Sequence, residues 1–97
     1  MATYLIYSQW TDQGIRNIKE SAKRLDAGRS KLKEFGGDMK AFYMTHGQYD
    51  MVAIVELPND EVLAKYLLSL GSQGNFRTHT VRAYTEDEYR RILDGLS

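Results

Sequence analysis

The chain is 97 residues long, with 42% hydrophobic and 27% charged residues, a composition typical of one small globular domain spanning residues 1–97. Lysine plus arginine and aspartate plus glutamate each total 13, so the net charge is +0, and this balance argues against a protein that tracks the phosphates of nucleic acids. Because there is no cysteine and no apolar run near the roughly 18 residues of a membrane span, we expect no disulfide, no thiolate metal site, no membrane anchor and a cytoplasmic location.

The N-terminal third predicts a strand followed by a long amphipathic helix. Thr3–Ser8 is short, apolar and rich in β-forming residues, and Thr11 is positioned to cap the start of the helix. Apolar residues then recur at steps of three, four or seven, which is the buried stripe of a helix: Ile15, Ile18, Ala22, Leu25 and Leu32. Glycine weakens a helix by about 1 kcal/mol relative to alanine, so we expect a kink near Gly28 and the end of the helix at Gly36–Gly37.

The segment Lys40–Glu56 predicts a central hairpin. Its arms are Lys40–Thr45 and Tyr49–Glu56, and they flank a reversal at Gly47–Gln48. Met51–Val55 is apolar on both side-chain parities, which is typical of a strand that is covered on both faces. We therefore place the second arm in the middle of the sheet.

A second helix, a fourth strand and a short C-terminal helix follow. Pro58–Asp60 opens the second helix, whose apolar positions are Val62, Leu63, Tyr66, Leu67 and Leu70. Phe76–Tyr84 predicts the fourth strand, and Thr85–Glu88 has the spacing of a capping box for the terminal helix. The order βαββαβ with right-handed crossovers predicts an α+β, ferredoxin-like fold: a four-stranded antiparallel sheet with both main helices on one face, plus the C-terminal helix.

The face of this sheet without helices predicts self-association. Several positions on it are large and apolar or aromatic, and one copy alone would expose them as a patch of the size that marks interfaces. A two-fold homodimer that packs sheet against sheet covers the patch most simply, and a higher homo-oligomer stays open as a prediction. The alternative is a monomer whose C-terminal helix covers the open face.

Three segments carry a family resemblance: HGQYD at His46–Asp50, Gly14 shortly after Thr11, and GSQGNFRTHTVRAYTEDE at Gly71–Glu88. With these segments in order over nearly the whole chain, the sequence resembles the GYD domain family. The Gly-Tyr-Asp-type signature that names the family is here spread over Gly47, Tyr49 and Asp50. The resemblance implies a ferredoxin-like subunit that associates as a dimeric α/β barrel, and it implies no particular chemistry.

His46 and Asp50 are candidate catalytic residues because they lie on either side of the predicted bend. An aspartate that accepts a hydrogen bond from a histidine ring fixes its tautomer and raises its basicity, as a general base requires. The commoner alternative is that Asp50 caps backbone N–H groups while His46 stays in solvent. His79, on the fourth strand, is the other candidate base.

Four further residues are candidates for ligand binding: Tyr43, Tyr49, Arg77 and Trp10. The tyrosines flank the bend and could orient a small ligand through their hydroxyls, Arg77 could hold a carboxylate with two N–H groups, and Trp10 could form the wall of a cleft. The competing interpretation gives all four structural roles in strands, the core or an interface rim. Two histidines without ligand spacing predict no metal site, and no motif predicts a cofactor.

Three functions fit these residues. The first is a binding module for a small anionic or aromatic ligand. The second is a cofactor-independent isomerase or monooxygenase acting on a small activated acid or phenol, in which His46 or His79 removes a proton and Asp50 orients the histidine. The third is a purely structural dimer. A helix-turn-helix would need residues that this chain does not have to spare, so we expect no binding to DNA.

Overall fold

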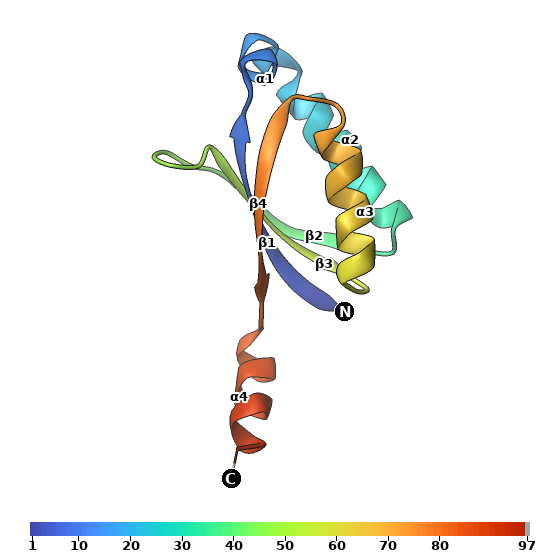
Figure 1. The fold of residues 1–97 in the computed structure, drawn as a ribbon, viewed down its shortest axis with the longest axis vertical. Coiled ribbons are helices and arrows are strands. Elements are labelled where there is room, and N and C mark those ends of the chain that lie inside the picture. Colours follow the sequence, from blue (N-terminus) through green and yellow to red (C-terminus); the bar gives the residue numbers. More distant parts are fainter. Residues whose placement is uncertain (97) are drawn as a thin grey trace.

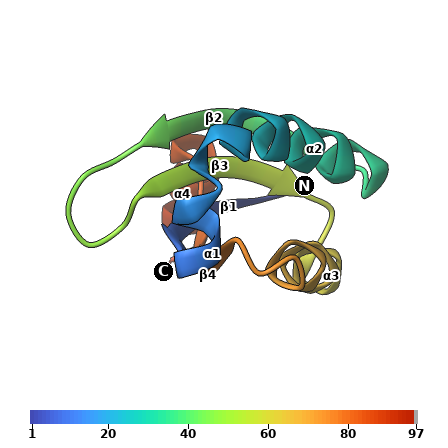
Figure 2. The same cartoon turned by 90° about the horizontal axis from the view of Figure 1, so that it is seen from above.

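The computed structural model describes residues 1–96, which form a four-stranded antiparallel sheet with the main helices on one face (Figure 1). The elements in chain order are β1 (Ala2–Trp10), α1 (Asp12–Arg16), the 3-10 turn η1 (Ile18–Glu20), α2 (Ser21–Glu34), β2 (Asp38–Met44), β3 (Met51–Leu57), α3 (Asp60–Gly71), β4 (Phe76–Ala83) and α4 (Glu86–Asp94). The strand order is β2-β3-β1-β4, and Figure 2 shows α2 and α3 on the same side of the sheet. The predicted ferredoxin-like fold and the central place of the second hairpin arm are confirmed.

The first helical segment is broken where a continuous helix was predicted. The break lies at Asn17–Glu20, between α1 and α2, whereas α2 runs without interruption through Gly28, where the sequence predicted a kink. Ile15 and Ile18 are 48% and 37% exposed, and Ala22 is exposed as well, so of the predicted buried stripe only Leu32 is buried and Leu25 half-buried. The predicted stripe assumed one straight helix. Because the chain bends between α1 and α2, residues on the two sides of the bend do not share one face.

Arg24 and Gly14 give the physical reason for the break. The Arg24 guanidinium donates to the carbonyl oxygens of Asn17 at 3.0 Å and of Gly14 at 3.3 Å, which satisfies the C-terminal end of α1 without continuing the helix. Gly14 itself is buried against the turn before β4, because a Cβ there would lie 1.8 Å from the Asn75 carbonyl oxygen. The short α1 therefore docks on the chain instead of extending α2.

The predicted helix ends agree with the structure. The side chains of Thr11 and Asn59 accept the N–H groups of Gly14 and Val62, at 3.1 Å and 3.0 Å, at the starts of α1 and α3. Gly36 has a φ of 83°, the left-handed conformation that closes the C-terminus of α2. The predicted capping box at the start of α4 is present in full, from the Thr85 cap to Glu88.

The core lies between the helices and the sheet. Its buried side chains are Tyr4, Ile6, Leu32, Val55, Leu57 and Tyr66. Burying a large apolar side chain stabilises a fold by about 1.5–3 kcal/mol, so these contacts supply most of the attraction between the two layers. The Tyr66 hydroxyl also donates to the Gly28 carbonyl oxygen at 3.0 Å and so joins α3 to α2.

The other face of the sheet carries no helix. Tyr4 and Ile6 of β1 point into the core, so Leu5 and Tyr7 point to the open face, together with their cross-strand partners. Two rows of side chains run in register across the middle of this face: Ala41, Ile54, Leu5 and Val81 form one, and Tyr43, Val52, Tyr7 and His79 form the other. We call these eight residues the central rows.

The helix α4 does not cover the central rows. It continues past the end of β4 and projects away from the sheet (Figure 1). Its apolar residues recur at helical spacing and are all exposed in one copy: Tyr89 (56%), Ile92 (49%), Leu93 (45%) and, just beyond the helix, Leu96 (70%). The alternative of a monomer that closes its own open face with the terminal helix is therefore wrong for this structure.

Candidate functional site

The bend between β2 and β3 is a closed loop over Thr45–Asp50. Gly47 has a φ of 102°, a conformation that glycine adopts without steric cost. The Thr45 N–H donates to the Asp50 carbonyl oxygen at 2.8 Å, and the Thr45 hydroxyl donates to the Tyr49 carbonyl oxygen at 2.7 Å. In Figure 1 this loop reaches out on the side of the sheet opposite α2 and α3.

Asp50 fixes the loop to β1. Its carboxylate accepts the Trp10 N–H at 3.0 Å, and its own N–H donates to the Ser8 carbonyl oxygen at 2.9 Å. His46 is exposed at the loop tip, and in the described part of the chain no hydrogen bond joins it to Asp50. The two candidates are therefore held in the arrangement in which the aspartate caps a backbone N–H group. Their catalytic roles stay a prediction.

The ring of Tyr49 contacts two other aromatic rings of the open face, those of Tyr7 and His79. Its ring centroid lies 5.0 Å from that of Tyr7 and 5.4 Å from that of His79, and both rings are tilted against it. Tilted contacts at these distances are favourable for aromatic pairs. Tyr43 is 59% exposed at the far end of the same cross-strand row, with Val52 between it and Tyr7. The loop thus adds a ring to the central rows.

A shallow polar groove of about 710 Å3 lies at the corner between the loop and the start of α1. Its walls include four residues of β1 and the loop, namely Gln9, Trp10, Gln48 and Asp50, and Arg77 from β4. The Gln9 side chain donates to the Gln48 carbonyl oxygen at 2.7 Å and ties one wall to the other. We call this groove the corner groove. It brings together three residues that the sequence singled out, Trp10, Asp50 and Arg77.

The strongly shifted tyrosines lie elsewhere, in the core. Burial raises the pKa of Tyr4 to about 12, and so does its hydrogen bond of 2.5 Å to the Asp60 carboxylate. Burial alone raises the pKa of Tyr66 to about 12. Both phenols stay protonated at neutral pH and donate hydrogen bonds, so neither supplies a base.

Sequence reasoning missed two kinds of residue. Gln9 and Gln48 line the corner groove, and their place could be found from strand parity and from their position beside the bend. Arg24 lies in the first predicted helix and was not singled out, yet it is half-buried against α1 and lines a cavity between the helices and the sheet. Only the break in the first helix turns it inward, and no sequence pattern predicted that break.

Chemically, the site offers aromatic surface, amides and one arginine. Within residues 1–96 no three histidine, aspartate or glutamate side chains are grouped so as to hold a metal ion. The longest helices among these residues are also too short or too polar to cross a membrane. The arrangement is suited to recognition through apolar contact and hydrogen bonds.

Comparisons with known proteins identify the family and the relatives that the chain resembles in sequence. The profile of the family described as GYD domain matches residues 4–93. A Thermus thermophilus protein, described as glutamine synthetase and cystathionine beta-lyase binding protein, is 31% identical over 84 residues, which cover 86% of this chain and 88% of that protein.

Solved structures show the shared fold. The crystal structure of FFRP-DM1 matches with a TM-score of 0.60 and 21% identity, over 87% of this chain and 100% of that chain. The leucine response regulatory protein of Mycobacterium tuberculosis matches with a TM-score of 0.64 and 15% identity, over 87% of this chain and 51% of that chain.

Proposed function

This chain belongs to the GYD domain family, and we propose that it acts as a homodimeric binding module in which two copies pack the open faces of their sheets together as a dimeric α/β barrel. The observation that carries the proposal is the layout of the open face. The central rows are mostly apolar, whereas Gln9 and Arg77 lie beyond one end of them and Asp38 and Glu56 beyond the other. An apolar centre with a polar rim is typical of protein interfaces.

The open face alone is smaller than the area that a stable dimer buries, so the dimer needs a second surface. Strands spaced about 4.8 Å apart and rising about 3.3 Å per residue give the face a projected area of roughly 500 Å2. A stable interface buries about 800 Å2 on each partner. The remaining area comes from side chains that stand out from the sheet and from the apolar stripe of α4. We therefore place α4 against the second copy.

The Thermus relative supports binding as the class of function. Its name states that it binds glutamine synthetase and cystathionine beta-lyase, and this chain is 31% identical to it. We propose that the dimer of this chain also binds other proteins. We do not assign those two enzymes to it as partners. We place this activity in the cytoplasm.

A small anionic or aromatic ligand in the corner groove is the second candidate. The groove is within the roughly 300–1,000 Å3 of small-molecule sites, and Arg77 and Trp10 offer it a cation and an aromatic wall. The Asp50 carboxylate accepts the Trp10 N–H, and the dipole of this N–H offsets part of its repulsion of an anion. Thermal shift with carboxylates tests this role, since a ligand at 100 times its Kd adds about 2.7 kcal/mol of stability.

The cofactor-independent enzyme remains an alternative prediction. It requires that His46 or His79 remove a proton from a small acid or phenol. If a turnover is detected and both His46→Ala and His79→Ala leave it unchanged, these roles are excluded.

Light scattering after gel filtration tests the homodimer. We expect twice the 11.2 kDa of one chain for the native protein, and the mass of one chain for Ile54→Glu, which puts a charge in the central rows. Leu68→Glu is the matched control, because Leu68 is 75% exposed on α3 and the dimer should persist. A native protein with the mass of one chain at micromolar concentration would contradict the proposal.

A further inference from the structure

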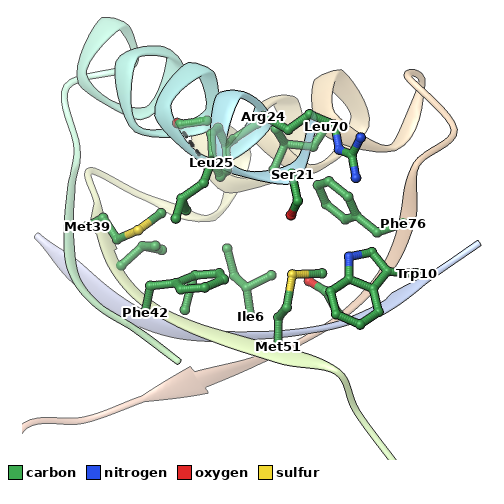
Figure 3. A pocket seen from close by; sticks show the side chains of 15 residues that line it. Ile6, Trp10, Ser21, Arg24, Leu25, Met39, Phe42, Met51, Leu70 and Phe76 are labelled. Atoms are coloured by element: carbon green, nitrogen blue, oxygen red, sulfur yellow. Dashed lines mark hydrogen bonds between the residues drawn. The ribbon is translucent and has the colours of Figure 1, made fainter. Parts of the chain in front are cut away.

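The helix side of the sheet contains a cavity that the proposed function does not use. It has about 70 Å3 of free volume and lies between α2, α3 and the sheet. Figure 3 shows its two ends: Leu25, Met39 and Phe42 lie at one side, and Ser21, Arg24, Trp10 and Phe76 lie at the other. We call this space the helix-side cavity. It has an apolar end and an end with polar and charged groups.

Arg24 is the charged group of this cavity. It is half-buried, and its two hydrogen bonds go to the backbone carbonyl oxygens of Asn17 and Gly14. Among the residues that the structure describes, five ion pairs form and none includes Arg24. A guanidinium has five N–H donors, so donors remain for an anion.

The solvent reaches the polar end. Trp10 and Ser21 are half-buried like Arg24, whereas Ile6 and Val55 on the cavity floor are buried. The Ser21 hydroxyl points into the space in Figure 3. A ligand could therefore place its apolar part inward and its charged group beside Arg24 and Ser21.

The volume limits the size of that ligand. A cavity of about 150 Å3 holds benzene, and one water occupies about 30 Å3 of liquid. The helix-side cavity is about half the size of the benzene cavity, which suits an aliphatic group of about three or four carbon atoms. A drug-sized molecule would not fit.

We propose that the helix-side cavity binds a short branched-chain carboxylic acid, with its alkyl group between Leu25 and Phe42 and its carboxylate on Arg24. Arginine binds a carboxylate through two parallel N–H groups, and the half-buried position of Arg24 places this contact at the solvent-accessible end of the cavity. The inference is independent of the homodimer, since the cavity lies on the opposite side of the sheet from the central rows.

Fluorescence of Trp10 tests the proposal directly. Trp10 is the single tryptophan of the chain and lines both this cavity and the corner groove, so a ligand in either place changes its emission and the variants below assign the signal to the cavity. We expect a saturable change with isovalerate, and binding at least about tenfold weaker for isovaleramide, which has the same shape without the charge.

Three variants separate recognition from folding. Arg24→Gln should weaken the binding of isovalerate at least about tenfold, while its amide still donates to the end of α1. Lys23→Gln is the control: it removes the same charge from an exposed neighbour and should leave binding unchanged. Ala53→Leu fills the cavity without touching Arg24 and should abolish binding, with the native circular dichroism spectrum retained.

Three outcomes would overturn the proposal. They are the absence of a saturable signal up to about 10 mM isovalerate, equal binding of the amide, and unchanged binding by a folded Ala53→Leu variant. The assay uses the same native protein whether it is a dimer or a monomer, so failure here leaves the homodimer untouched.

Discussion

The ring of Tyr49 lies 5.0 Å from the ring of Tyr7, although one belongs to the hairpin loop and the other to a central strand. The contact holds the loop against the open face of the sheet. It also places the loop beside the surface that we propose for the homodimer, so the packing of this pair affects both the fold and the assembly.

Tyr49→Ala should loosen the hairpin loop. An aromatic pair contributes about 0.5–1.5 kcal/mol beyond the burial of its area, so we expect hydrogen exchange of the Thr45 and Asp50 amides to accelerate about tenfold. These amides donate to Asp50 and Ser8 and report the loop directly. His46→Ala, at an exposed position in the same loop, is the control and should leave both rates unchanged. Equal acceleration in the two variants would show that the Tyr7 contact does not hold the loop.

Ile92→Glu should weaken the homodimer without unfolding the protein. Ile92 is 49% exposed in one copy and belongs to the apolar stripe of α4, which we place against the second copy. Burying an unpaired charge in an interface costs several kcal/mol, so the dissociation constant in sedimentation should rise at least about tenfold. Arg91→Glu introduces the same group on the opposite side of α4 and should have a smaller effect. A similar effect of both would place α4 in solvent.

Gly14→Ala should destabilise the fold. The added Cβ would lie 1.8 Å from the Asn75 carbonyl oxygen, so α1 has to move away from the turn before β4. Overpacking of this kind costs about 1–3 kcal/mol, measured as the free energy of unfolding in urea. Gly71→Ala is the matched control, because nothing lies within 4 Å of its added Cβ, and it should be neutral or stabilising by up to about 1 kcal/mol.

Stability should fall at alkaline pH, in part through Tyr66. Burial raises its pKa from 10.0 to about 12 in the folded state, so the unfolded chain loses this proton first as the pH rises. The contribution is fully present below pH 10 and is lost as the pH rises toward 12. Tyr66→Phe should make the urea midpoint fall less steeply in this range than it does in the native protein. Tyr84→Phe, at an exposed position, should leave the slope unchanged.

Tyr66→Phe also has an effect at neutral pH. It removes the hydroxyl that donates to the Gly28 carbonyl oxygen and leaves that buried oxygen without this partner, which costs about 1–2 kcal/mol. An unchanged stability at pH 7 would mean that α2 and α3 do not depend on this bond.

The sequence alone predicted the order of helices and strands, because the alternation of apolar residues and the caps at Thr11, Asn59 and Thr85 are local signals. The apolar segment Met51–Val55 likewise predicted the central strand β3. The sequence did not predict the break after α1, because Ile15 and Ile18 keep a helical spacing to Leu25 whether or not the helix bends. The bend depends on Gly14 meeting Asn75, a contact between residues far apart in the chain.

The candidate site divides in the same way. Residue type and parity singled out Trp10, Asp50 and Arg77, which meet at the corner groove, and Tyr49 and His79, which meet on the open face. The sequence could not pair Asp50 with the Trp10 N–H or turn Arg24 toward a cavity, because both follow from the packing of β1 and α1 on distant segments. Periodicity and capping act over a few residues and are written in the sequence, whereas the direction of a long side chain is fixed only when the elements around it have packed.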